Sequence, residues 1–234
     1  MPDKDFVILL LGPMRSGKTS FVKHLNGEGD VNTCKWASGT TTQCNTHKFE
    51  LSGTKYRIID TPGLEDAPRS NLSVLKMIAA EMDKIGKEGL TIGGVVYFHR
   101  ITNLRLTGSD RANIEIFERI CGSSFLYRAA FATTMWNTVG SRERSKFSQL
   151  HTSIEKKYAH LTKQGTEFFK FETNKRNSAE PILQFFASAS SRSGPRLQLE
   201  GEVMRTGLSA TSIRRTEAGK GIVRQMNGGG CTIL

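Results

Sequence analysis

The sequence has no apolar run long enough to span a membrane as a helix. A spanning helix needs about 18 apolar residues, whereas the longest run here covers 6–11 and stops at Gly12. Lys4 and Asp5 precede that run directly, so it does not match the apolar region of a secretory signal peptide. We therefore expect a cytoplasmic protein.

Cysteine is scarce and scattered. The chain contains Cys34, Cys44, Cys121 and Cys231, and their spacing is not that of a zinc site. Isolated cysteines of this kind are typical of a reducing compartment. Cys231 differs from the others because it stands in a C-terminal lipidation-type motif, described below.

Acidic residues are outnumbered by basic ones. The chain has 33 Lys and Arg against 22 Asp and Glu, a formal net charge of +11. Such an excess indicates an anionic partner, either a membrane surface or nucleic acid. No aromatic residue follows Phe186, so the basic C-terminal part lacks the rings that stack on bases. We expect a membrane partner and no nucleic acid.

The most informative stretch is a phosphate-binding pattern. The unbroken apolar run 6–11 is typical of a buried parallel strand, and it leads into Gly-x4-Gly-Lys-Thr at 12–19, followed by a helical pattern. Glycines let successive backbone N–H groups face phosphate oxygens, and the lysine reaches the β- and γ-phosphates. The predicted nucleotide contacts here are Gly12, Pro13, Arg15, Ser16, Gly17, Lys18, Thr19 and Ser20.

A magnesium site is predicted beside this loop. The Thr19 hydroxyl stands at the metal-ligand position of the pattern. Asp60 follows the predicted strand 55–59, where an acidic residue holds the metal through water. The polar, turn-rich segment 28–43 corresponds to a flexible first switch, whose threonines bind metal and sense the γ-phosphate. A Ser/Thr-rich loop without contacts is the alternative for that segment.

The tetrapeptide Asp-Thr-Pro-Gly at 60–63 narrows the prediction further. Alone it is only a turn signal, but about forty residues after a phosphate loop it indicates a GTPase-type switch. Gly63 can bring its N–H close to a γ-phosphate because no side chain intervenes. No glutamine follows at the position that orients water in Ras-type enzymes, so we expect slow hydrolysis.

The remaining patterns predict a three-layer α/β fold of the P-loop NTPase type, with a mostly parallel sheet and one antiparallel edge hairpin. The hairpin pairs 46–51 with 55–59. The other predicted strands are 95–98, 129–133 and 168–171, and the predicted helices are 73–85, 110–120, 142–161 and 181–187. This G domain is expected to occupy 1–189.

Residues 190–234 are predicted to form a flexible, disordered basic tail. Arginines and lysines outnumber three glutamates there, and large apolar residues are sparse, so a core is not expected. The last four residues, beginning with Cys231, form a Cys-a-a-X prenylation pattern ending in leucine. One prenyl chain binds membranes weakly, and the nearby basic residues supply a second attraction.

Several of these motifs together resemble the septin-like GTPases. They are Asp-Thr-Pro-Gly-Leu at 60–64, Thr41 with Cys44, the His-Arg-Ile strand end at 99–101, and Thr-Thr-Met-Trp at 133–136. This family includes the immunity-associated (AIG-type) and plastid import-receptor GTPases, and the fungal G-domain proteins look most similar. The resemblance covers about residues 6–189. It implies a Mg·GTP-binding domain that often pairs across its nucleotide faces.

The resemblance also assigns individual residues. It aligns Thr41 with the switch threonine that binds the metal, and it places Arg105 near an arginine at the pairing surface. Lys18, Thr41 and Gly63 are thus the candidate catalytic residues, while Thr19, Thr41 and Asp60 are the candidate metal ligands. The possible homodimer through Arg105 is a further expectation.

The base-recognition segment departs from the family pattern. GTPases carry Asn/Thr-Lys-x-Asp at this strand end, and here Thr134 is followed by Met135 and Asn137. Thr134 and Asn137 are the predicted contacts for this end of the nucleotide. A neutral amide offers one acceptor oxygen where a carboxylate offers two, so selectivity for guanine should weaken.

The sequence therefore predicts a GTP-binding protein with slow Mg²⁺-dependent hydrolysis. It would act as a switch on the cytosolic face of a membrane. Two alternatives stay open at this point. One is a scaffold that holds nucleotide without turnover and stabilises a dimer or polymer, and the other is an NTPase with relaxed base specificity.

Overall fold

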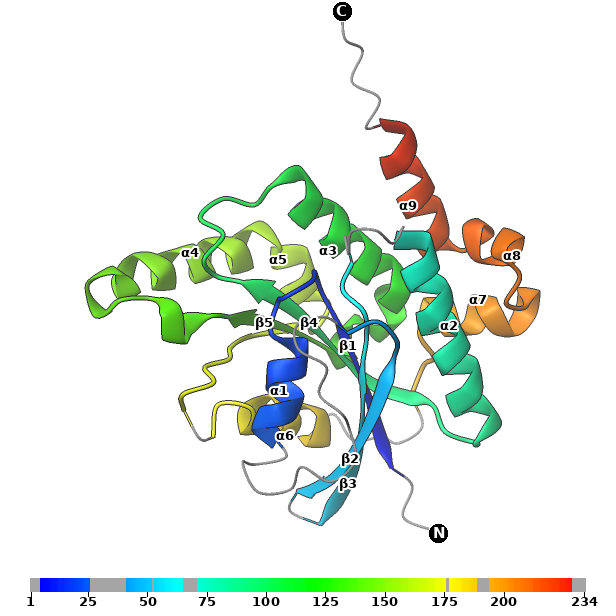
Figure 1. The fold of residues 1–234 in the computed structure, drawn as a ribbon, viewed down its shortest axis with the longest axis horizontal. Helices are drawn as coiled ribbons and strands as arrows, with labels where there is room; N and C mark the ends of the chain where they lie inside the picture. Colours follow the sequence, from blue (N-terminus) through cyan, green and yellow to red (C-terminus); the bar gives the residue numbers. More distant parts are fainter. Residues whose placement is uncertain are drawn as a thin grey trace, which may run out of the picture.

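A six-stranded sheet in the order β2-β3-β1-β4-β5-β6 forms the centre of the molecule (Figure 1). The structure is a computed structural model that describes residues 5–25, 41–51, 53–64, 71–175, 177–188 and 194–228. The strands are β1 (Phe6–Leu11), β2 (Asn45–Leu51), β3 (Thr54–Asp60), β4 (Ile92–Arg100), β5 (Ala129–Thr134) and β6 (Glu167–Lys170). Only β2 and β3 pair antiparallel, and every other neighbouring pair is parallel.

Helices cover both faces of the sheet and make three layers. The α-helices are α1 (Lys18–Leu25), α2 (Asn71–Lys87), α3 (Gly108–Cys121), α4 (Arg144–Lys157), α5 (Ala159–Lys163), α6 (Glu180–Ser188), α7 (Gln198–Thr206), α8 (Ala210–Arg215) and α9 (Glu217–Gly228). Short 3₁₀ helices lie at Ser123–Arg128, Trp136–Thr138 and Ser141–Glu143. None of the helices described is long and apolar enough to cross a membrane.

Two apolar cores follow from the alternation of side chains along the central strands. On one face, Ile8 and Phe98 pack with Phe21 of α1 and Phe186 of α6. On the other face, residues of the same strands pack with α2 to α5 in a larger cluster. The predicted three-layer α/β fold with one antiparallel edge hairpin is confirmed.

The predicted single helix over 142–161 is wrong. The structure has a 3₁₀ turn, then α4, then a break at Tyr158 before α5. At Tyr158 the backbone leaves helical geometry, with φ −104° and ψ 31°, and its buried ring stacks on Phe131 of β5 with centroids 6.5 Å apart. The helix is therefore interrupted where Tyr158 packs against the sheet.

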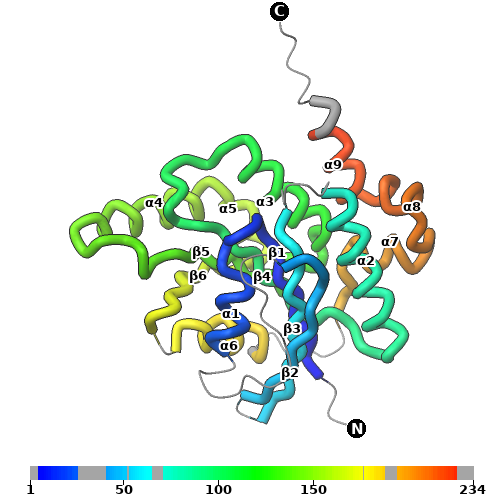
Figure 2. The backbone as a smooth tube through the Cα atoms, viewed as in Figure 1, coloured from blue at the N-terminus to red at the C-terminus, as the bar shows by residue number. Residues whose placement is uncertain are grey.

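The prediction of a flexible, disordered tail is also wrong for 194–228. Helices α7, α8 and α9 pack against α2 and α3 (Figure 2). They bury Leu199, Val203, Ile213 and Ile222, each at most 4% exposed. These apolar residues are too few to form a separate core, but they pack into the core that α2 and α3 share with the sheet. The domain predicted for 1–189 therefore extends to α9, while Cys231 lies outside the described residues.

Candidate functional site

The phosphate loop connects β1 to α1 and is held by its own lysine. Gly12 has φ +139°, and a Cβ there would lie 2.4 Å from the Phe98 carbonyl oxygen, so only glycine fits. The Lys18 ammonium is buried and donates to the carbonyl oxygens of Gly12 at 3.0 Å and Pro13 at 2.9 Å. Because α1 begins at Lys18, its first N–H groups lie at the loop, where an anion is favoured.

The three predicted metal ligands lie together, although they come from separate parts of the chain. The Thr19 hydroxyl donates to Asp60 Oδ2 at 2.6 Å, and the Thr41 hydroxyl donates to the same oxygen at 3.2 Å. The two hydroxyl oxygens are 3.1 Å apart. Helix α1, the segment before β2 and the end of β3 thus meet at one point beside Lys18.

This cluster fits a magnesium ion on chemical grounds. Asp60 Oδ1 is buried and has no hydrogen-bond partner among the described residues. Burial raises the pKa of the Asp60 carboxyl, while hydrogen bonds from Thr19 and Thr41 and the charge of Lys18 act in the opposite direction. A divalent cation would stabilise the carboxylate, and hydroxyl and carboxylate oxygens are the ligands Mg²⁺ prefers. Within the described ranges, no group of three His, Cys, Asp or Glu offers another metal site.

The residues that follow β3, 61–64, pack directly onto the phosphate loop. The sequence did not predict this contact. The Leu64 N–H donates to the Gly12 carbonyl at 3.1 Å, and the Met14 N–H donates to the Leu64 carbonyl at 3.3 Å. A Cβ on Gly63 would lie 2.4 Å from the Met14 backbone. Gly63 therefore has a packing reason to be glycine, in addition to its predicted approach to a γ-phosphate.

The end of β5 supports the loop from the other side. The Thr134 hydroxyl donates to the Ser16 carbonyl at 2.8 Å and so positions the loop, while its predicted contact with nucleotide stays a prediction. Met135 has a left-handed backbone with φ 65°. The Trp136 indole N–H donates to the Thr133 carbonyl at 3.1 Å, which holds this turn in place. Asn137 lies exposed on the turn, where its amide is available to a ligand.

The other predicted loop residues differ in how accessible they are. Arg15 is exposed and has a left-handed backbone with φ 59°. Ser16 is fully buried, and its hydroxyl has no partner among the described residues. Ser20 is half-buried on α1. Ser16 is therefore the hydroxyl that the fold leaves unsatisfied inside the loop.

Comparison with known proteins agrees with this architecture. A family model described as "50S ribosome-binding GTPase" matches residues 7–92, which include the phosphate loop and the switch segment. No curated protein sequence matches the chain. Toc33 from Arabidopsis thaliana, solved with GDP and Mg²⁺, is similar at a TM-score of 0.58 and 18% identity, covering 82% of this chain and 88% of Toc33. The chain has the fold of a GTPase G domain.

Other solved G domains are similar to the same extent. Era, in complex with MgGDPNP and part of 16S ribosomal RNA, has a TM-score of 0.55 and 16% identity over 79% of this chain and 56% of Era. Another Toc33 structure, with Mg²⁺ and GMPPNP, has a TM-score of 0.56 and 18% identity over 79% of this chain and 85% of Toc33. The dimerisation of Toc33 and the related psToc159 is described as important for their GTPase activity.

Two predicted residues remain, Arg105 and Cys231. Arg105 lies exposed in the loop between β4 and α3 of this G domain. Its role in pairing stays a prediction, since the structure holds a single chain. Cys231 is outside the described residues, so its lipidation also stays a prediction.

Proposed function

We propose that this protein binds GTP with Mg²⁺, hydrolyses it slowly and acts as a switch at a membrane. The observation that carries the proposal is the meeting of Thr19, Thr41 and Asp60 within 3.2 Å of one another, beside the buried Lys18. Two lines support a guanine nucleotide. The matched family model is one of GTPases, and the similar Toc33 structures hold GDP or GMPPNP with Mg²⁺.

Each residue has a defined task in this proposal. Lys18 exchanges its bonds to the loop carbonyls for the β- and γ-phosphates, and the loop N–H groups hold the same oxygens. The hydroxyls of Thr19 and Thr41 and the carboxylate of Asp60 would hold Mg²⁺. Mg²⁺, when bound, supplies positive charge that stabilises the transferred phosphoryl group.

We expect slow turnover because leucine, and not glutamine, follows Gly63. Leu64 is 1% exposed, and its backbone is bonded to the phosphate loop. An apolar, buried side chain cannot orient an attacking water. Water would therefore be positioned by backbone groups, by a partner subunit or by an activating protein.

The test compares two lysines on α1. Lys18→Ala should lose nucleotide binding, whereas Lys23→Ala, on the exposed side of the same helix, should keep the wild-type affinity. Titration with a fluorescent GTP analogue measures both. Near-wild-type affinity in Lys18→Ala would remove the proposal. Identification of the nucleotide that copurifies with the protein gives an independent answer.

Relaxed base specificity is the second candidate, and exposed Asn137 favours it because its amide lacks the charge of a carboxylate. Competition of ATP against labelled GTP separates the two, since equal affinities would contradict guanine preference.

A non-hydrolysing scaffold is distinguished from a GTPase by single-turnover hydrolysis, in which a scaffold releases no phosphate over hours. If pairing through Arg105 assists turnover, Arg105→Ala should lower hydrolysis only at protein concentrations at which the wild type dimerises.

Membrane attachment through prenylated Cys231 completes the proposal. Helices α8 and α9 carry exposed basic side chains close to that residue in the chain, namely Arg214, Arg215, Lys220 and Arg224. Each basic group near an anionic surface contributes about 1 kcal/mol. Cys231→Ser should move the protein from the membrane to the supernatant fraction, and unchanged partitioning would contradict this part of the proposal.

A further inference from the structure

A group of buried polar side chains lies between the end of β4 and the start of α3. His99 on β4 and Asn113 on α3 are both 0% exposed. Neither ring nitrogen of His99 has a hydrogen-bond partner in the described part of the chain, and the same holds for the amide oxygen and nitrogen of Asn113. Buried polar atoms without partners are rare in folded proteins because each one costs desolvation energy. Four such atoms on adjacent elements need an explanation.

The packing of β4 on α3 places these two side chains opposite each other. Tyr97 and Phe117 pack with ring centroids 5.2 Å apart. His99 lies two residues further along the strand, about 6.6 Å, and Asn113 lies four residues back along the helix, about 6 Å. Tyr97 meets Phe117, and His99, later on the strand, lies near Asp110, earlier on the helix, so the two elements run in opposite directions and the two steps match. His99 Nδ1 is also 3.9 Å from Asp110 Oδ1, one turn earlier on α3.

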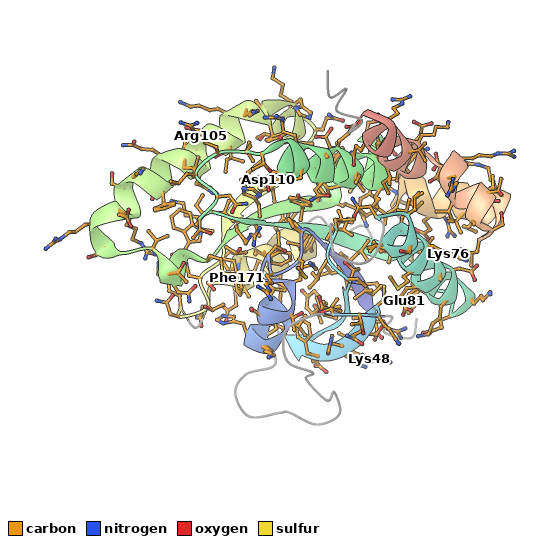
Figure 3. All side chains as sticks on the ribbon, turned by 45° about the horizontal axis from the view of Figure 1, so that its top comes forward. Lys48, Lys76, Glu81, Arg105, Asp110 and Phe171 are labelled. Carbon is orange, nitrogen blue, oxygen red and sulfur yellow. The ribbon has the colours of Figure 1, made fainter. Side chains whose placement is uncertain are left out.

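Asp110 is the residue that closes the loop before α3. Its Oδ2 accepts hydrogen bonds from the Thr107 N–H at 2.9 Å and the Thr107 hydroxyl at 2.7 Å. Its Oδ1 accepts a long bond of 3.4 Å from the Asn103 amide. Between these anchors the loop exposes Leu104, 52% accessible, and Arg105. Figure 3 shows Arg105 and Asp110 at this turn into α3.

We propose that His99, Asp110 and Asn113 form a binding site for ordered water, which fixes the loop carrying Arg105. A gap of 3.9 Å is too long for a direct hydrogen bond. One water can lie about 2.8 Å from both atoms and still reach a third group. The role of Arg105 in pairing rests on the proposed function. The water site itself does not depend on that function.

The hydrogen-bonding capacity of the three side chains fits water better than other ligands. A neutral histidine offers one donor and one acceptor, an asparagine amide offers both kinds, and a carboxylate accepts. Burial lowers the pKa of His99, which favours the neutral ring. A metal is disfavoured, because no group of three His, Cys, Asp or Glu suited to it occurs in the described ranges. An apolar ligand would leave all four atoms unsatisfied.

The first test is a crystal structure of the unmodified protein at about 1.5 Å resolution. We expect a water within hydrogen-bond distance of His99 and of Asp110 or Asn113. A dry space, or a direct bond between His99 and Asn113, would overturn the proposal. Neither result depends on whether the protein binds GTP.

The second test replaces the polar pair with apolar groups of similar shape. If no water lies between His99, Asp110 and Asn113, the double variant His99→Phe with Asn113→Leu removes four unsatisfied polar atoms. Its free energy of unfolding should then rise. If water bridges them, the double variant loses the bridge, and amide hydrogen exchange at Asn103 and Thr107 should quicken about tenfold. His151→Phe is the matched control, because it alters a buried histidine that has a protein partner, Thr133, at 2.9 Å. Unchanged exchange in the double variant would contradict the proposal.

Discussion

The Thr134 hydroxyl donates a hydrogen bond to the Ser16 carbonyl oxygen at 2.8 Å, across 118 positions of sequence. The bond joins the end of β5 to the phosphate loop, and Thr134 is 2% exposed there. The next residues, Met135 to Asn137, form the turn predicted to meet the base. This buried contact therefore joins the phosphate loop to the turn that is predicted to meet the base.

Removal of that contact should weaken both stability and nucleotide binding. Thr134→Val keeps the shape but leaves the Ser16 carbonyl without its donor, which should cost about 1–2 kcal/mol in the free energy of unfolding. Urea unfolding and GTP titration measure the two effects. Thr138→Val is the control, because its hydroxyl is exposed. Equal stability of the two variants would show that the contact is unimportant.

A methyl group at Gly63 should displace the phosphate loop. Its Cβ would lie 2.4 Å from the Met14 backbone, so we expect Gly63→Ala to reduce nucleotide affinity at least about tenfold (about 1.4 kcal/mol). Gly86→Ala on α2 meets no atom within 4 Å, and alanine should stabilise that helix by about 0.5–1 kcal/mol. Thermal unfolding and GTP titration of both variants check this, and wild-type affinity in Gly63→Ala would contradict it.

The C-terminal helices should contribute to the stability of the whole domain. Ile222 on α9 is 2% exposed, and Ile222→Ala should lower the free energy of unfolding by about 2–5 kcal/mol. Met204 on α7 is 63% exposed, so Met204→Ala should change it by less than about 0.5 kcal/mol. Chemical denaturation measures both. A flexible tail would instead make the two variants indistinguishable.

Stability should fall in mild acid because of His151. Burial, with a smaller contribution from the charge of Lys170, lowers the pKa of its ring from 6.5 to about 4. Between these values the unfolded chain binds a proton that the folded chain does not. The stabilisation present above about pH 6.5 is therefore lost as the pH falls toward 4.

The measurement is urea unfolding at several pH values between 7 and about 4.5, with His151→Asn as the comparison. Groups that titrate in both proteins cancel in the difference. The variant should show a flatter dependence of unfolding free energy on pH. The same slope in both proteins would contradict a buried, neutral His151.

Selectivity for guanine should improve when Asn137 is replaced by the aspartate that GTPases commonly carry at this strand end. Asn137→Asp supplies two charged acceptors for the guanine N–H groups, which should raise the ratio of GTP to ATP affinity about tenfold or more. Thr138→Asp adds the same charge at the adjacent exposed position and should not change the ratio. Competition binding measures the ratio of GTP to ATP affinity in both variants. An unchanged ratio in Asn137→Asp would show that the base does not contact residue 137.

The parts of the fold predicted correctly are those with strong local signals. The apolar run of β1, the glycine spacing after it and the turn between β2 and β3 act over a few residues, so their patterns are readable without a partner. The break at Tyr158 was not readable, because it depends on contact with Phe131 of another strand. Helices α7 to α9 were missed for the same reason, since their few apolar residues match surfaces on α2 and α3.

The sequence by itself determined the phosphate chemistry of this protein. A lysine, a threonine and two glycines at defined spacing need only the local strand, turn and helix to become a phosphate loop. Tertiary structure alone decided the contacts by which Thr19, Thr41 and Asp60 meet and Thr134 holds the loop. It also decided that polar atoms of His99 and Asn113 are buried without a hydrogen-bond partner among the described residues. These contacts join residues far apart in the chain, and only the packed sheet and helices bring such residues within hydrogen-bond distance.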